Sequence, residues 1–210
     1  VIVPAASSAV QVTVPAPPDE PDFPEVRTGM RTALLITMLL AALYGLVFSI
    51  FGSANRTGVL DLWASFGLGA ALLLLSYIDL RTGLLLDILT WPLVALGLGY
   101  AAHVGDLAPA LSGAVVGYVL IAGLAMMWRR ARGYEGIGLG DAKLLAAGGA
   151  WVGLYELPVV LLIASGIGLV VALTVSQRTR SDSHRVAIVF GPCLALGIWS
   201  AWCTDLIAYA

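Results

Sequence analysis

Charged residues are scarce in this chain. Only 11% of its 210 residues are charged and 60% are hydrophobic, whereas a soluble domain has about 25% charged and about 45–50% apolar residues. The net charge of −2 indicates no basic surface, and therefore no nucleic-acid partner. This composition predicts an integral membrane protein that contacts the lipid bilayer.

Cysteine is almost absent, and the two cysteines form no C-x-x-C pair. Cys193 and Cys203 lie ten residues apart in an apolar segment. We therefore expect neither a zinc site nor a disulfide framework, and interpret both as small core residues. The sequence predicts no metal and no cofactor. It also shows no secretory signal peptide, because the first apolar run is too long and follows an acidic, proline-rich stretch.

Apolar stretches are abundant, and seven of them approach the roughly 20 residues that a transmembrane helix needs. They cover residues 33–51, 62–80, 88–104, 109–128, 141–155, 157–176 and 187–208. The runs are apolar all round rather than alternating, which disfavours a β-barrel. We predict an all-α fold, a polytopic bundle of about seven transmembrane helices. Glycines four apart, as at 113/117 and 149/153, favour close helix packing.

The basic residues indicate how the bundle is oriented. With seven spans, ten of the eleven lysines and arginines fall on the side of the N-terminus, and only Arg56 falls on the other. The positive-inside rule places the basic side in the cytoplasm. We therefore predict a cytoplasmic N-terminus and an external C-terminus.

The first residues of the chain differ from the rest. Residues 1–31 contain six of the ten prolines and four acidic residues, which predicts a disordered cytoplasmic tail. We expect an N-terminal transmembrane helix and loop at 32–61, followed by the main membrane unit at 62–210.

Two aspartates lie at the edges of apolar stretches, where an ionisable group is costly and marks a functional site. Asp79 ends the second stretch and Asp141 begins the fifth, so the predicted topology puts both at the cytoplasmic side. Two neighbouring carboxylates share a proton, so one can activate a water while the other donates a proton. Equally, Asp141 could be only a helix cap, and Asp79 only an interfacial acid beside Arg81.

The residues around Asp141 offer further candidates. Alternating glycines precede it: Gly136, Gly138 and Gly140. They favour an extended segment that could pair with a substrate strand, or a simple flexible turn. Asp141 would then lie near a helix N-cap, where Lys143 could tune the local field. Glu135 could assist the site or be an ordinary loop acid, and Asp87 is interpreted as a solvated loop residue or helix cap.

Three stretches together resemble the type IV prepilin peptidase family. They are YIDLRTGLLLDILTWPL at 77–93, RGYEGIGLGDAKLLAAGGAWVG at 132–153 and VAIVFGPCLALGIW at 186–199. The second is similar to the family's G-x-G-D-x-K-L-L block over many positions. The resemblance implies that Asp79 and Asp141 are the catalytic aspartates, and that Gly138 and Gly140 are the glycines of the motif.

The resemblance also implies a function. It is that of an intramembrane aspartyl endopeptidase in the bacterial inner membrane, which removes the leader of a prepilin or pseudopilin at the cytoplasmic face. A six-helix protease core would follow the extra helix at 33–51. Leu86 and Val189 stand where the family usually has proline, so we expect altered loop geometry. Without the C-x-x-C pairs that many members carry, we expect no N-methyltransferase activity. The sequence indicates no oligomeric state.

Two other functions remain open. The chain could be a non-catalytic assembly factor of a pilus or secretion system, although the intact second block favours an enzyme. It could also be a small proton-coupled transporter that uses Asp79 and Asp141. A transporter would favour acids near the membrane midplane and an inverted repeat, and the sequence shows neither.

Overall fold

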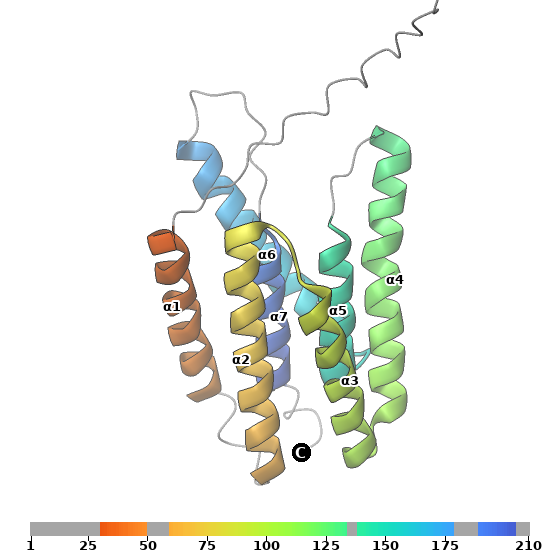
Figure 1. Cartoon of the computed structure of the whole chain (residues 1–210). Coiled ribbons are helices and arrows are strands. Elements are labelled where there is room, and N and C mark those ends of the chain that lie inside the picture. The colour runs from red at the N-terminus through yellow and green to blue at the C-terminus, as the bar shows by residue number, and fades with distance from the viewer. Residues whose placement is uncertain (1–29, 50–58, 134–137, 179–188, 205–210) are drawn as a thin grey trace, which may run out of the picture.

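The fold is a bundle of helices that run along a common axis (Figure 1). The computed structural model describes residues 30–49, 59–133, 138–178 and 189–204, and there the regular secondary structure is entirely helical. The helices are α1 (Met30–Val47), α2 (Val59–Thr82), α3 (Asp87–Val104), α4 (Leu107–Arg132), α5 (Leu139–Val152), α6 (Leu157–Arg178) and α7 (Gly191–Thr204). The predicted all-α bundle of about seven helices is confirmed.

Three of the described helices are long and apolar enough to cross a membrane, namely those at Leu60–Thr82, Leu107–Arg132 and Leu157–Thr174. Their outer surfaces carry large apolar side chains, such as Trp63 and Phe66 of α2, which water would not favour. The chain is therefore a membrane protein. In contrast, α5 and α7 have only 14 residues each, shorter than the predicted stretches.

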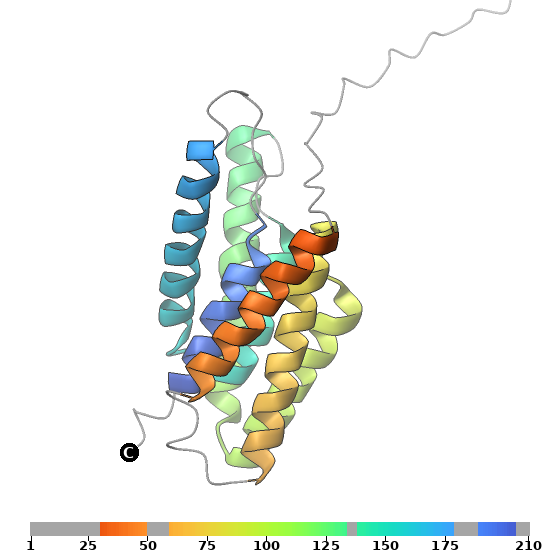
Figure 2. The same ribbon diagram turned by 90° about the vertical axis from the view of Figure 1, so that its left-hand side faces the viewer.

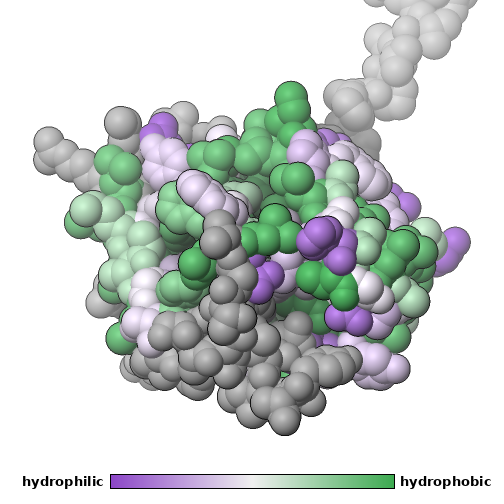
Figure 3. Space-filling view, turned by 90° about the horizontal axis from the view of Figure 1, so that it is seen from below, coloured by the Kyte–Doolittle hydropathy of each residue, from purple (hydrophilic) through white to green (hydrophobic). Residues whose placement is uncertain are grey.

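Successive helices alternate in direction, so the bundle has two distinct ends (Figure 1). At one end α2, α4 and α6 finish and α3, α5 and α7 begin. This end carries Arg81 in the last turn of α2 and three arginines in the last turn of α4. We call it the basic end. The opposite end carries Asp61 in the first turn of α2 and Asp106 before α4, and hydrophilic side chains lie there among hydrophobic ones (Figure 3).

Helix α5 lies at the centre of the core, since its residues from Leu144 to Val152 are all buried. The predicted close packing of glycines is confirmed where α4 crosses it. A Cβ at Gly149 would overlap the backbone of Gly113, and a Cβ at Gly117 would lie 2.8 Å from the carbonyl oxygen of Leu145. Only glycine allows the two backbones to approach this closely.

Aromatic side chains join four helices near the end opposite the basic end. Tyr100 stacks on Trp151 at 5.8 Å between ring centroids, and Trp202 meets both rings edge-on at 5.3 Å. The Trp202 indole donates a hydrogen bond to Ser65, and the Tyr100 hydroxyl donates one to Asp61 at 2.8 Å. These contacts connect α2, α3, α5 and α7, and so hold the helices that carry the predicted site.

Helix α1 lies across α2 and α7 (Figure 2). Its Tyr44 is buried and stacks on Trp199 of α7 at 5.1 Å, and the Trp199 indole donates a hydrogen bond to the Tyr44 carbonyl. The division of the chain into a tail, an extra helix and a core stays a prediction, and the predicted tail lies largely outside the described residues.

Candidate active site

Asp79 is a buried acid, 5% exposed, near the end of α2. The backbone N–H of Gly191, the first residue of α7, donates a hydrogen bond to its carboxylate. A Cβ on Gly191 would overlap that carboxylate. The partial positive charge at a helix N-terminus stabilises an anion there. Asp79 is therefore held by the backbone of a segment more than a hundred residues away in the sequence.

Asp141 lies in the first turn of α5, three residues after the N-cap Gly138. Gly138 is extended, as predicted, with φ −70° and ψ 131°. The expectation that Gly140 is also extended is wrong, because Gly140 is the second residue of the helix. The Leu85 side chain packs against it, so that a Cβ on Gly140 would be 2.9 Å from the Leu85 Cβ. Gly140 thus provides space for the Leu85 side chain rather than an extended backbone. Gly136 lies outside the described residues.

The two aspartates are close enough for their charges to act on one another. Both also act electrostatically on the thiol of Cys193, in the first turn of α7. Cys193 is buried, as predicted for a core residue, but its position beside both acids was not predicted. The signal that could have located it is the third stretch, whose F-G-P-C-L places a cysteine two residues after the glycine that contacts Asp79. The first turns of α5 and α7 and the end of α2 thus meet around two carboxylates.

Among the described residues, Lys143 pairs with Asp87 rather than with either of the two aspartates. Its ammonium contacts both carboxylate oxygens of Asp87, at 2.5 and 2.7 Å. Asp87 is exposed to solvent, as predicted, but it is the first residue of α3 rather than a loop residue, and it binds α5. The suggested effect of Lys143 on the field at Asp141 stays a prediction. Glu135 lies outside the described residues.

A short connection joins α2 to α3 beside the site. Gly83 adopts φ +64°, which glycine tolerates best, and its N–H donates to the carbonyl of Asp79 at 2.8 Å. Leu86 is the N-cap of α3 with φ −73°, a value that proline also adopts. The backbone conformation at Leu86 is therefore one that leucine and the family's usual proline can both adopt.

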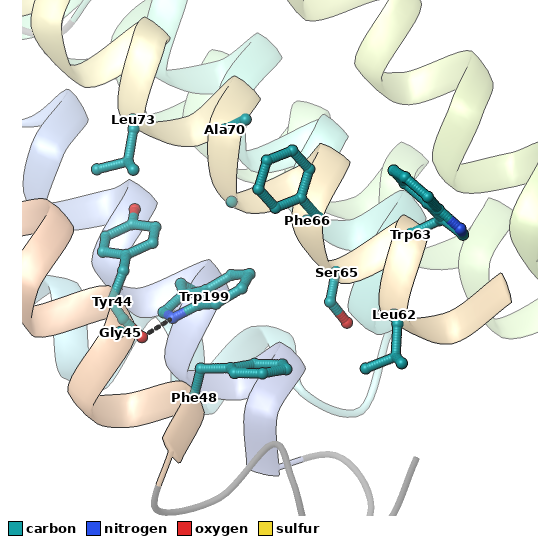
Figure 4. A pocket seen from close by; sticks show the side chains of 11 residues that line it. Tyr44, Gly45, Phe48, Leu62, Trp63, Ser65, Phe66, Ala70, Leu73 and Trp199 are labelled. Atoms are coloured by element: carbon teal, nitrogen blue, oxygen red, sulfur yellow. Dashed lines mark hydrogen bonds between the residues drawn. The ribbon is translucent and has the colours of Figure 1, made fainter. Parts of the chain in front are cut away.

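A hollow lies away from the aspartates, between α1, α2 and α7 (Figure 4). It is an apolar groove of about 920 Å³ with Tyr44, Phe48, Trp63, Phe66 and Trp199 among its lining residues. Its lining contains no carboxylate and none of the candidate site residues, so we do not place the chemistry there. Among the described residues, no cluster of three or more His, Cys, Asp or Glu side chains could hold a metal ion.

Comparison with known proteins decides the family. The model of the type IV leader peptidase family matches residues 66–173, which include both aspartates. The chain belongs to the type IV leader peptidase family. The predicted family is thereby confirmed.

Several curated leader peptidases are similar to this one. The prepilin leader peptidase/N-methyltransferase of Burkholderia pseudomallei is 41% identical over 165 residues, which cover 78% of this chain and 52% of that protein. The protein of the same name from Escherichia coli is 47% identical over 146 residues, covering 67% and 60%. That of Neisseria gonorrhoeae is 37% identical over 170 residues, covering 79% and 55%. The chain spans about half the length of these relatives. No solved structure matches it.

Proposed function

We propose that this member of the leader peptidase family is an intramembrane aspartyl endopeptidase that removes the leader from type IV prepilin-like precursors. The observation that carries the proposal is the meeting of Asp79 and Asp141, from helices distant in sequence, at the basic end of a membrane bundle. Two acids that only capped helices would have no reason to converge, one of them buried and the other partly buried. The names of the relatives, which are prepilin leader peptidases, support the same reaction.

In the proposed mechanism the two carboxylates act as a unit. One accepts a proton from a water molecule, which attacks the carbonyl carbon of the scissile peptide bond. The other, protonated, donates to the carbonyl oxygen and later a proton passes to the leaving amine. Neither a metal nor a covalent nucleophile is required. Gly191 and Gly138 would keep the carboxylates in place without covering them with a side chain.

The proposed location follows from the distribution of charge. Arg81 and the arginines that end α4 lie at the same end as the aspartates. The positive-inside rule would place this end at the cytoplasmic face of the bacterial inner membrane. The proposed substrate is a prepilin or pseudopilin whose leader precedes a hydrophobic helix. The absence of methyltransferase activity stays a prediction.

Conservative single substitutions test the proposal. Asp79→Asn and Asp141→Asn variants would each be incubated with a purified type IV prepilin, and leader removal followed by mass spectrometry. We expect both to lose processing, while Asp106→Asn, an exposed acid at the opposite end without a side-chain cap bond, processes normally. Wild-type processing by either site variant would show that the two aspartates are not the catalytic pair. No processing by the wild-type protein of any prepilin would favour the assembly-factor alternative.

A further inference from the structure

The ion pair between Lys143 and Asp87 links the two segments of the chain that follow the two aspartates. Lys143 follows Asp141 by two residues in α5, and Asp87 follows Asp79 by eight, at the start of α3. Both oxygens of Asp87 lie within hydrogen-bond distance of the Lys143 ammonium. The pair therefore connects the backbone just beyond one catalytic aspartate to the backbone just beyond the other.

The segment between Asp79 and Asp87 is itself well fixed. It is closed at its start by the bond from the Gly83 N–H to the Asp79 carbonyl. Thr82 also stabilises the turn, since its hydroxyl accepts a hydrogen bond from the Leu84 N–H at 3.2 Å. At its end the Leu86 carbonyl accepts from two N–H groups of α3. A segment held in this way can transmit the position of Asp87 to Asp79.

The same segment also touches α5 next to Asp141. The Leu85 side chain packs on Gly140, the residue directly before Asp141. The connection and the first turns of α5 are thus joined at two places, by Leu85 on one side of Asp141 and by Asp87 on the other. Residues two apart on a helix do not face each other, so Lys143 can bind Asp87 while Asp141 faces the site.

We infer that Asp87 and Lys143 are positioning residues, an ion pair outside the site that sets the separation of the Asp79 and Asp141 carboxylates. This inference rests on the proposed function and adds to it two residues that touch neither the substrate bond nor the water. Their side chains are 59% and 26% exposed, and an ion pair this accessible to water contributes little to stability. Its effect should appear in the rate instead, because a displacement of about 1 Å at the reacting groups can cost roughly 100-fold.

The test separates the rate of the reaction from folding and substrate binding. Asp87→Asn and Lys143→Met would be purified, their thermal midpoints measured, and their kcat and KM determined on a purified type IV prepilin. We expect nearly unchanged midpoints, an unchanged KM, and a kcat lowered roughly 10- to 100-fold. The double variant Asp87→Lys with Lys143→Asp, which restores the pair with reversed charges, should recover most of the wild-type kcat. Asp87→Glu, which keeps the charge, should also retain it.

The outcomes distinguish this inference from its alternatives. Asp106→Asn is the matched control, an exposed acid at the N-terminus of a helix, where it is the N-cap, and should leave both constants unchanged. A KM that rises at constant kcat would make Asp87 a residue that binds the basic leader, and would overturn the inference. So would a double variant as slow as the single ones, or single variants at the wild-type kcat. A wild-type protein that cleaves no prepilin would refute the proposed function instead.

Discussion

Single glycines determine how closely the backbone approaches each carboxylate. Gly191 brings its N–H directly to Asp79, and Gly140 admits Leu85 beside Asp141. Neither glycine has a positive φ, so the site requires glycine at these positions because it has no side chain. At the scale of the residue, the site is therefore built from the space around two acids as much as from the acids themselves.

Substitution of Gly191 tests this interpretation. In Gly191→Ala the added methyl group would overlap the Asp79 carboxylate, which must move away. We expect leader removal to slow by roughly 100-fold, because the reacting groups lose their alignment. The measurement is the initial rate of processing of a purified type IV prepilin. Gly67→Ala is the control, since a Cβ there meets no atom within 4 Å. Equal rates for the two variants would contradict the prediction.

The sequence singled out Asp79 and Asp141 as candidates, because a charged residue at the edge of an apolar run is conspicuous whatever its neighbours. Their surroundings were harder to predict. The contact of Gly191 with Asp79, and that of Lys143 with Asp87, each joins segments separated by more than fifty residues. No local pattern encodes such a contact. Lys143 was predicted as part of the site, but its partner depended on where α3 begins relative to α5.

At the scale of the helix, the packing of α4 against α5 depends on backbone contact. Gly113 and Gly149 meet without intervening side chains, and the Leu154 N–H donates to the Pro109 carbonyl just beyond them. This contact fixes α5, and Asp141 stands in its first turn. The packing that stabilises the bundle thus also locates one of the two carboxylates.

Gly149→Ala is expected to destabilise the protein by about 1–3 kcal/mol, the usual cost of overpacking a close interface. The added methyl group would overlap the backbone of Gly113, which cannot rotate away. Unfolding in detergent, followed by tryptophan fluorescence, would measure the change. Gly123→Ala in α4 has open space around its Cβ, so it should be neutral or gain up to about 1 kcal/mol from better helix propensity. A stability loss common to both variants would argue against a specific role of the interface.

Helix type and number were predictable from hydropathy, whereas several helix ends were not. The predicted stretch at 109–128 stops where the apolar run stops, but α4 continues to Arg132. Arginine is a good helix former, so the helix ends only at Gly133, whose φ of +76° closes it. At α7 the predicted start at 187 preceded the observed Gly191, because the glycine and proline that begin the helix read as part of one apolar run.

At the scale of the whole molecule, the bundle has one basic and one acidic end, and the aspartate pair lies at the basic one. The alternation of seven helices places the start of α1 and the end of α7 at opposite ends (Figure 1). This arrangement agrees with the predicted topology. Which end faces the cytoplasm depends on insertion, and so requires a measurement in cells.

Accessibility of single cysteines would establish the orientation. We expect Asp106→Cys to react with a membrane-impermeant maleimide in spheroplasts, and Arg130→Cys to react only in inverted vesicles, because arginine-rich ends stay in the cytoplasm. Both positions are exposed at opposite ends of α4. Cys193 and Cys203 would first be replaced by alanine. Labelling of Arg130→Cys from outside would reverse the proposed topology.

The unequal lengths of α4 and α5 have a consequence for depth. From the level where Gly117 meets Leu145, α4 continues for eleven residues to Trp128, whereas α5 extends back only four to Asp141. At 1.5 Å per residue, Asp141 lies about 10 Å below Trp128. Tryptophan and arginine together favour the headgroup layer, so the carboxylates would sit in a recess beneath it. A precursor would have to lower its scissile bond out of bulk water to be cut, and the recess would have to admit the hydrolytic water with it.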